Sequence, residues 1–523
     1  MTGTEAVPTE TDHQPTPSRR TVHLAMAGLM LGMLMAMLDN LIVSTALPTI
    51  VGDLGGLARL SWVVTAYALG AAVTTPFWGK LGDLHGRKIM FMAAIVLFLI
   101  GSALAGLSQG MNQLIGFRAV QGLGAGGLMV GAMATLGDLV PPRERGRYMG
   151  LIGGMMPIAF VGGPLLGGFL TQHLSWRWCF YVNVPLGVVA LLVTGLGMKL
   201  PRRRLRARLD YLGGALLTVG VVAVTLVASW GGGQYPWASA PILLLSCLAA
   251  LALGAFVLSQ HRVPEPILPP HMFRDRNFTV AQVLSFLVGA AMFGAVNFLP
   301  QYMQYVQGAS PTASGLLLLP LMFGMLAVML TAGQITSRTG RYRVFVITGG
   351  AVLTAGMLVL LLLRVDTALL VASLLTVVVG LGMGFLMQNT MLITQNSVEL
   401  RDMGAASGAV TLFRTIGGSL GIALLGSLYT RGLDHRLAAR LGAAQGHALI
   451  SAHVPPSAVR ALPGPAREAF EAAVVSGVHE VFLGGALLAA VAFAVSWLIR
   501  EVPLRGSVPG SAPAERAGSV AAE

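Results

Sequence analysis

The chain contains fourteen separate runs of predominantly apolar residues, and this feature restricts its fold more than any other. A membrane-spanning helix needs about 20 such residues, because lipid offers no hydrogen-bond partner to an open backbone. The sequence therefore predicts an all-α membrane protein with 14 transmembrane helices. The expected spans are 22–46, 61–79, 89–108, 112–136, 147–170, 180–198, 210–230, 240–259, 278–300, 312–333, 343–363, 367–392, 404–429 and 479–499.

Composition agrees with a chain whose solvent is partly lipid. Of the 523 residues, 55% are hydrophobic and only 11% are charged, whereas soluble proteins carry about 25% charged residues. The net charge of +13 does not indicate nucleic-acid binding, because the basic residues fall between apolar runs instead of gathering on one face. The lipid bilayer is the expected partner, and no nucleic acid is expected.

The basic residues predict the orientation in the membrane. With both termini inside, the cytoplasmic connections carry nineteen Lys and Arg, and the short outer connections carry only Arg59, Arg177 and Arg364. Such an asymmetry is typical of bacterial cytoplasmic (inner) membrane proteins, in which positive loops stay inside. The richness in Ala, Gly and Arg also suggests a bacterial genome. Residues 1–20 and 501–523 are expected to be disordered cytoplasmic tails.

An internal repeat divides the chain. GKLGDLHGRK follows the second run at 79–88, and GQITSRTGRYR follows the tenth at 333–343, so G-x6-G-R recurs 254 residues later. We therefore expect two pseudo-symmetric six-helix halves, as in many secondary transporters. The expected division is an N-terminal half at 21–200, an inserted helix pair at 201–276 and a C-terminal half at 277–500. The last half includes a long outer loop, 430–478, which we interpret as a spacer with short surface helices.

One carboxylate, Asp39, lies in the middle of the first apolar run. An ionised Asp at the centre of a bilayer costs about 2.5–3.5 kcal/mol, so an acid there is a functional candidate by default. Arg118 lies at a similar depth in the fourth run, and we expect the two to pair directly, through Gln121 or through water. The hypothesis is that Asp39 exchanges a proton, with Arg118 balancing its charge. The alternative is a structural anchor within the first helix.

Four further stretches carry recognisable patterns. In GKLGDLHGRK, Gly79 and Gly86 allow close approach and a tight turn, while Asp83 and Arg87 place opposite charges at a helix end. Asp138, before the next basic cluster, is a second partner for Arg87. We expect these five residues to form a cytoplasmic latch; the alternative is a plain basic loop. The other stretches are RAVQGLGAGG from Arg118, WRWCFYVNVP at 176–185 and GGMMPIAFVGGPLLGG at 153–168, in which the signature residues are Gly163, Pro164, Gly167 and Gly168.

With LDNLIVSTALP at 38–48, these stretches resemble the major facilitator superfamily, specifically its 14-helix drug:proton antiporters (QacA/EmrB-like), over about residues 20–500. Asn40 and Leu41 depart from the family's first-helix pattern, and Ala159 departs from its fifth-helix pattern. The resemblance implies that Asp83 lies near the start of the helix at 404–406. It also implies that the glycine-rich fifth helix is a signature of exporters.

The leading hypothesis is a proton-coupled efflux antiporter for small lipophilic drugs or antibiotics, working by alternating access as a monomer. The alternative is a same-fold exporter of one metabolite: an amino acid, a lipid, a siderophore or a self-made antibiotic. An enzyme is not expected, since no H-E-x-x-H or G-x-S-x-G stretch is present. No metal or cofactor is expected either; without a Walker A sequence, the proton gradient is the expected energy source. Candidate residues of the substrate cavity, each also explicable by packing, are Trp62, Tyr67, Gln121, Phe293, Asn297, Gln301, Gln388 and Asn389.

Overall fold

The computed structural model describes residues 19–54, 60–140, 142–197, 210–232, 235–442, 445–446, 449, 459–460 and 462–504. Within them, thirteen helices are long and apolar enough to cross a membrane. Helix α2 (Leu60–His85) is the remaining long helix, which brings the total to the expected fourteen. The all-α membrane fold predicted from the sequence is therefore confirmed.

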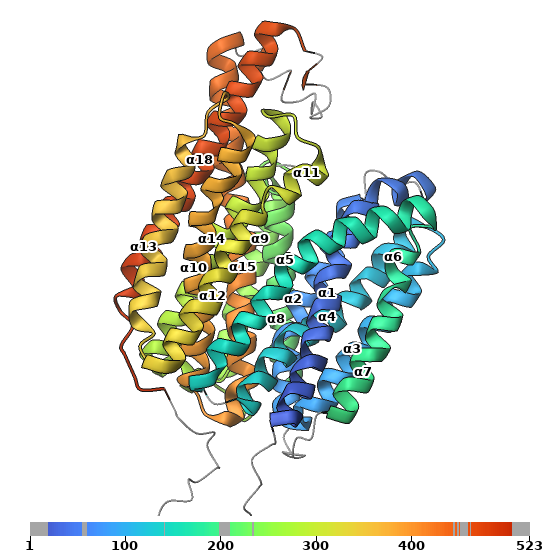
Figure 1. The fold of residues 1–523 in the computed structure, drawn as a ribbon, viewed down its shortest axis with the longest axis vertical. Helices are drawn as coiled ribbons and strands as arrows, with labels where there is room; N and C mark the ends of the chain where they lie inside the picture. Colours follow the sequence, from blue (N-terminus) through green and yellow to red (C-terminus); the bar gives the residue numbers. More distant parts are fainter. Residues whose placement is uncertain are drawn as a thin grey trace, which may run out of the picture.

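The N-terminal half is a bundle of seven helical segments (Figure 1). Its core gathers around α1 and α4, where Leu29, Met33 and Leu128 are almost fully buried. Beside α2, the bounds are α1 (Arg19–Leu54), α3 (Arg87–Gly106), α4 (Met111–Leu139), α5 (Pro142–His173), the single turn α6 (Trp178–Tyr181) and α7 (Asn183–Gly197). At the outer end, Asp53 accepts hydrogen bonds from Trp176 (2.8 Å) and Arg177 (3.2 Å), which lower the pKa of its carboxyl group.

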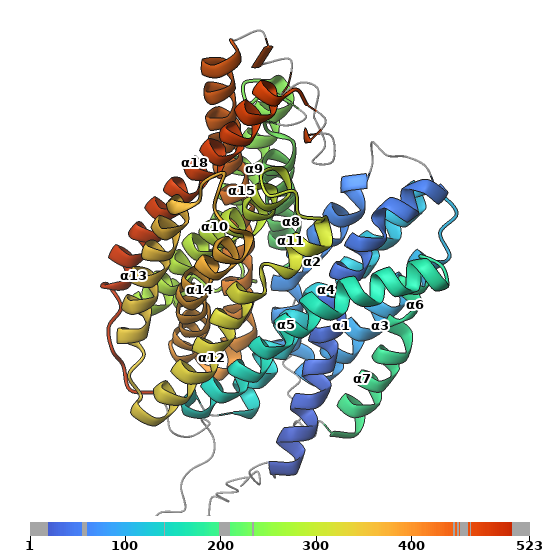
Figure 2. The ribbon, with the colours of Figure 1, turned by 45° about the horizontal axis from the view of Figure 1, so that its top comes forward.

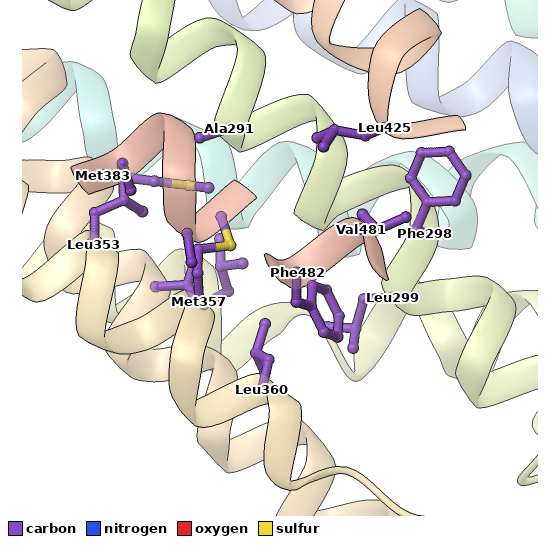
Figure 3. Close-up of a cluster of buried hydrophobic side chains, with 14 of the residues drawn as sticks. Ala291, Phe298, Leu299, Leu353, Met357, Leu360, Met383, Leu425, Val481 and Phe482 are labelled. Carbon is purple, nitrogen blue, oxygen red and sulfur yellow. The ribbon is translucent and has the colours of Figure 1, made fainter. Parts of the chain in front are cut away.

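The C-terminal half has its own apolar core, part of which Figure 3 shows. Met357, Met383 and Phe482 meet there from three different helices and are almost fully buried. The helices are α10 (Arg276–Tyr305), α11 (Pro311–Leu316), α12 (Leu319–Thr339), α13 (Arg343–Val359), α14 (Leu369–Asn396), α15 (Met403–Leu441) and α18 (Gly464–Ser496). Asp275 caps the first of these by accepting a hydrogen bond from Phe278 N (2.8 Å).

The inserted pair consists of α8 (Tyr211–Trp230) and α9 (Ala240–Gln260), which pack against each other. Helix α8 also contacts α15 and α2, so the pair lies against both halves. Asp210 caps α8 by accepting from Gly213 N (2.7 Å), and Gln260 at the end of α9 donates to the same carboxylate (2.6 Å). These bonds tie the start of α8 to the end of α9.

Two helices run into the segment that the sequence predicts to be an outer loop. Helix α15 has 39 residues and α18 has 33, lengths of about 58 and 50 Å at 1.5 Å per residue, against about 30 Å of hydrocarbon. They pack on each other beyond the other helices, at the top of Figure 1, where Gly432 lies against Gly477. The described part of 430–478 is therefore largely a helical extension of the bundle, which corrects the expectation of a loop with short surface helices. This segment contains polar residues, so a search for apolar runs does not identify its helices.

The two halves approach each other at the end of the molecule where α1 begins and α18 ends (Figures 1 and 2). There Gly150 and Gly153 of α5 contact Leu330 and Met329 of α12. Gln395 of α14 also donates to the Met133 carbonyl of α4 (3.1 Å). In both views the outer ends of the two bundles diverge.

Candidate functional site

Asp39 is fully buried on α1 and receives hydrogen bonds from three side chains. Arg118 of α4 pairs with Oδ2, while Gln121 (2.8 Å) and Asn183 (2.7 Å) both donate to Oδ1. The predicted proximity of Asp39 and Arg118 is confirmed, and the pairing is direct. Both oxygens of the buried carboxylate therefore have hydrogen-bond partners within the protein.

Arg118 is held from several sides as well. Its Nη1 also donates to Gln121 Oε1 (2.8 Å), and its Nε donates to the Val63 carbonyl of α2 (3.3 Å). The Tyr67 ring lies 4.2 Å from the guanidinium carbon, close enough for a cation–π contact. Tyr67 in turn donates to the Ala36 carbonyl of α1 (3.0 Å). The network therefore joins α1, α2 and α4.

Asn183 is a network residue that the sequence analysis did not single out. It is fully buried at the start of α7, and its amide donates both to Asp39 and to the Ser102 hydroxyl of α3 (2.9 Å). Ser102 itself donates to the Phe180 carbonyl (2.8 Å). The available signal was an amide side chain inside an apolar run, which indicates a polar partner on another helix.

Glycines of α4 let the surrounding helices approach closely enough to build this network. A Cβ on Gly126 would lie 2.5 Å from the Ala71 carbonyl of α2, and one on Gly124 would lie 2.5 Å from Phe98 N of α3. No larger residue fits either position without moving a helix backbone. Small residues at helix contacts are the usual device for such packing in membranes.

The residues of the expected latch do meet, at a contact between the two halves. Asp83 at the end of α2 accepts hydrogen bonds from the backbone N–H groups of Gly404 and Ala405, both 3.1 Å, at the start of α15. The helix N-terminus favours a carboxylate there. Gly79 lies against Gly404, where an added Cβ would be 2.5 Å from the carbonyl oxygen. The predicted placement of Asp83 near 404–406 is confirmed.

Arg87 links this contact to the N-terminal half. It pairs with Asp83 (Nη2–Oδ1, 2.7 Å) and with Asp138 at the end of α4. Gly86 separates α2 from α3 with φ of +96°, a conformation that glycine adopts without strain. Asp83 therefore touches both halves at once, and Arg87 fixes its direction.

The connection between α9 and α10, residues 261–275, adds a second bridge at the same end of the molecule, and we call it the strap. Glu265 of the strap pairs with Lys80 of α2 (2.7 Å), and His271 pairs with Asp402 before α15 (2.9 Å). Ile267 and Leu268, between these pairs, and Met272, just after them, are buried in a cluster with residues of α2 and α15. The strap thus contacts both halves at this end of the molecule.

The glycine-rich signature of α5 faces α1. A Cβ on Gly163 would lie 2.5 Å from the Leu41 side chain, and one on Gly167 would meet the Ile42 carbonyl at 2.7 Å. Gly168 has open space beside it, and Pro164 is partly buried within α5. Gly163 and Gly167 therefore allow α5 to pack directly on the helix that carries Asp39.

The structure does not gather the candidate cavity residues into one group. Tyr67 and Gln121 belong to the Asp39 network, and Trp62 packs edge-on against Trp230 of α8 (5.8 Å between ring centres). Asn297 is exposed and Gln301 is partly buried on α10, while the Phe293 side chain lies outside what the structure describes.

The two candidates on α14 are buried between helices of the C-terminal half. The Gln388 amide, oriented to match its neighbours, donates to the Met329 carbonyl (2.8 Å) and accepts from Gly333 N (3.2 Å) of α12. Asn389 donates to the Phe385 carbonyl of its own helix (2.7 Å). A role for either in binding substrate stays a prediction. Among the described residues no group of three or more His, Cys, Asp or Glu is placed to hold a metal ion.

Known proteins resemble the chain over most of its length. The family model described as Major Facilitator Superfamily matches residues 29–422. The uncharacterized MFS-type transporter Rv1877 of Mycobacterium tuberculosis is 42% identical over 494 residues, 93% of this chain and 70% of that protein. The multidrug transporter protein MdtP of Bacillus subtilis is 38% identical over 411 residues, 79% of this chain and 75% of that protein.

Solved structures agree on the fold. The proton:xylose symporter XylE aligns with a TM-score of 0.58 at 13% identity, over 89% of this chain and 94% of that one. At that identity the likeness concerns the fold alone. The family match covers well over half of the chain, and both relatives align with more than three quarters of it. The protein is therefore a multi-pass membrane transporter, and the chain belongs to the major facilitator superfamily.

Proposed function

We propose that this protein is a proton-coupled efflux antiporter that exports small lipophilic compounds across the bacterial cytoplasmic membrane, with both termini inside. The observation that carries the proposal is the buried Asp39–Arg118 pair in the N-terminal half. Asp39 is a buried acid that can lose or regain its charge when its donors move. The direction of transport is supported by relatives named as multidrug transporters and by the α5 signature.

The geometry suggests how proton and substrate movements are linked. In the present arrangement the cytoplasmic side is closed by Asp83 and the strap, and Asp39 is sealed from water with its donors in place. Proton uptake becomes favourable only when a donor, above all Arg118, withdraws from the carboxylate. Because α1 and α2 carry both the network and the cytoplasmic contact, a change of access disturbs the network directly.

The alternative reading of the network is purely structural, since a satisfied ion pair also anchors helices. The two readings differ in the effect of an uncharged isostere. We expect Asp39→Asn to reach the membrane but to lose proton-driven efflux, because the amide cannot exchange a proton. Asp39→Glu keeps a carboxyl group and should retain part of the activity.

The test is uptake of a lipophilic dye into everted membrane vesicles, which corresponds to efflux from the cell, with an imposed pH gradient and matched protein amounts. Ethidium and the anion 1-anilinonaphthalene-8-sulfonate are both tested. Asp53→Asn is the control, because Asp53 is an exposed acid at the outer end of the same helix. It should transport like the wild type. Gradient-driven efflux by Asp39→Asn at the wild-type rate would refute proton coupling through Asp39. Passive exchange that persists in this variant would be consistent with the proposal.

A further inference from the structure

Arg414 is a second arginine at membrane depth, and the proposed proton site does not use it. It lies in α15, ten residues after Gly404, so it is about 15 Å from the cytoplasmic contact at 1.5 Å per residue. That depth is near the middle of a hydrocarbon layer of about 30 Å. Charged residues at such depth are costly and are usually paired with an acid or a backbone carbonyl.

Arg414 has no such partner among the residues that the structure describes. Its Nε and Nη2 atoms are shielded from solvent and form no hydrogen bond, while the side chain as a whole is partly exposed. Arg118 offers the contrast. Its Nη2 also has no partner, but the side chain is fully buried and its charge is balanced by Asp39. Of these two arginines, Arg118 is compensated by an acid and Arg414 has no acid beside it among the described residues.

The turn of α15 that precedes Arg414 packs where the two halves meet. One turn earlier, Val410 is fully buried in a cluster with Met391 of α14 and Leu128 of α4. Helical side chains lean toward the preceding turn, so Arg414 leans toward this cluster. On the same helix, the Arg414 carbonyl lies against Gly289 of α10, and Gly417 lies against Phe286. Arg414 is thus framed by α10 and α14 above the closed cytoplasmic contact.

We propose that Arg414 binds an anionic group of the exported compound, so that the substrates include lipophilic organic acids. This rests on the proposed export function and names its substrate class. A guanidinium with free N–H donors in a medium of low dielectric constant binds a carboxylate or sulfonate strongly. The same charge repels lipophilic cations. An uncompensated arginine that is costly in the empty protein is neutralised when the substrate is bound.

The test measures equilibrium binding to the purified full-length protein in nanodiscs of phosphatidylcholine. The probes are fluorescein and 1-anilinonaphthalene-8-sulfonate as lipophilic anions and rhodamine 6G as a cation, all followed by fluorescence. Arg414→Gln should weaken binding of both anions at least about tenfold, as expected for loss of a charge-assisted contact. Arg414→Lys should retain much of the affinity, and rhodamine 6G should bind Arg414→Gln no more weakly than wild type.

Arg343→Gln is the matched control, because Arg343 at the start of α13 also has a shielded Nε without a partner. It should leave anion binding unchanged. Equal anion affinities for wild type and Arg414→Gln, or no anion binding by the wild type, would overturn the proposal. No gradient is imposed, so the result is independent of the efflux assay. If anion binding depends on Arg414 but proton-driven efflux is absent, the proposed function is wrong and the anion site is still supported.

Two further measurements separate other roles of Arg414. An anionic lipid headgroup shares the chemistry, so phosphatidylglycerol is added to the nanodiscs. The proposal expects the added lipid to change the affinity for the anionic probes less than twofold. Competition between this lipid and the probes that occurs in wild type but not in Arg414→Gln would assign the site to lipid. In thermal unfolding without ligand, Arg414→Gln should be as stable as wild type or more stable. A loss of thermal stability as large as that caused by Arg118→Gln would show that Arg414 is a structural residue and would overturn the proposal.

Discussion

Asn183 shows how much the Asp39 site depends on single uncharged side chains. Its amide is one of two donors to Oδ1 of Asp39, and it also binds Ser102. Asn183→Leu keeps the branching of the side chain but leaves the carboxylate with one donor fewer. Thermal or denaturant unfolding should show a loss of about 1–3 kcal/mol, the usual cost of an unsatisfied buried polar group.

The control for this prediction is Thr194→Val on the same helix. Thr194 is fully buried and its hydroxyl has no hydrogen-bond partner, so its removal should be neutral or stabilising. Equal losses in the two variants would mean that the Asn183 contact contributes nothing beyond packing.

At the scale of single residues, the sequence predicted those site residues whose charge is costly to bury in a membrane. Asp39 and Arg118 are conspicuous in apolar runs, and their mutual need for compensation predicted the ion pair. Asn183 was not singled out, because an amide in a helix does not reveal which of several helices it faces. Arg414 was not predicted, although it is an arginine within an apolar run, as Arg118 is. Only the structure shows that two of its nitrogens lack a hydrogen-bond partner.

At the scale of elements, the strap is the feature that the apolar pattern could not predict. Its residues are too few and too polar to register as a span, yet Ile267 and Leu268 are buried between α2 and α15. The long runs themselves predicted the helices well, because lipid leaves the backbone no other structure. The ends of α15 and α18 were not predicted, because outside the bilayer helices need not be apolar.

We expect the Lys80–Glu265 pair to stabilise the closed cytoplasmic side. Lys80→Glu places two carboxylates together and should loosen the strap, and Lys80→Glu with Glu265→Lys should restore it. A reporter cysteine at Ala409, which is fully buried, is added after Cys179 and Cys247 are replaced by Ser. Labelling from the cytoplasmic side should be about two- to fivefold faster in Lys80→Glu, because a partly exposed pair contributes up to about 1 kcal/mol.

Labelling at the parental rate in Lys80→Glu would show that the pair does not hold the strap. A double variant as fast as Lys80→Glu would show that the charge itself, and not its pairing, matters. The comparison thus isolates the ion pair from the apolar contacts of the strap.

At the scale of the whole molecule, the two halves touch through the cytoplasmic ends of α2, α4, α5, α12, α14 and α15. Asp83→Asn removes the charge that the start of α15 favours and one of the two partners of Arg87. The closed population should fall by about five- to thirtyfold, for a loss of about 1–2 kcal/mol. Turnover in vesicles should drop accordingly, while equilibrium dye affinity in detergent should stay within about twofold, because Asp83 lies far from Arg414 and Asp39.

Normal turnover by Asp83→Asn at normal expression would contradict the latch. Gly82→Ala is the control, since an added Cβ there meets only the Arg87 side chain at 3.9 Å. It should behave like the wild type in both assays.

The measurement that tests the central claim most directly is proton movement driven by substrate. Proteoliposomes with a pH-sensitive dye inside, and no imposed pH gradient, are given a gradient of a transported dye. In wild-type vesicles the internal pH should shift as protons move against the substrate, and a protonophore should abolish the shift. Asp39→Asn vesicles should move substrate down its gradient with no change in pH. A shift of wild-type size in Asp39→Asn, or wild-type transport with no shift at all, would contradict proton coupling through Asp39.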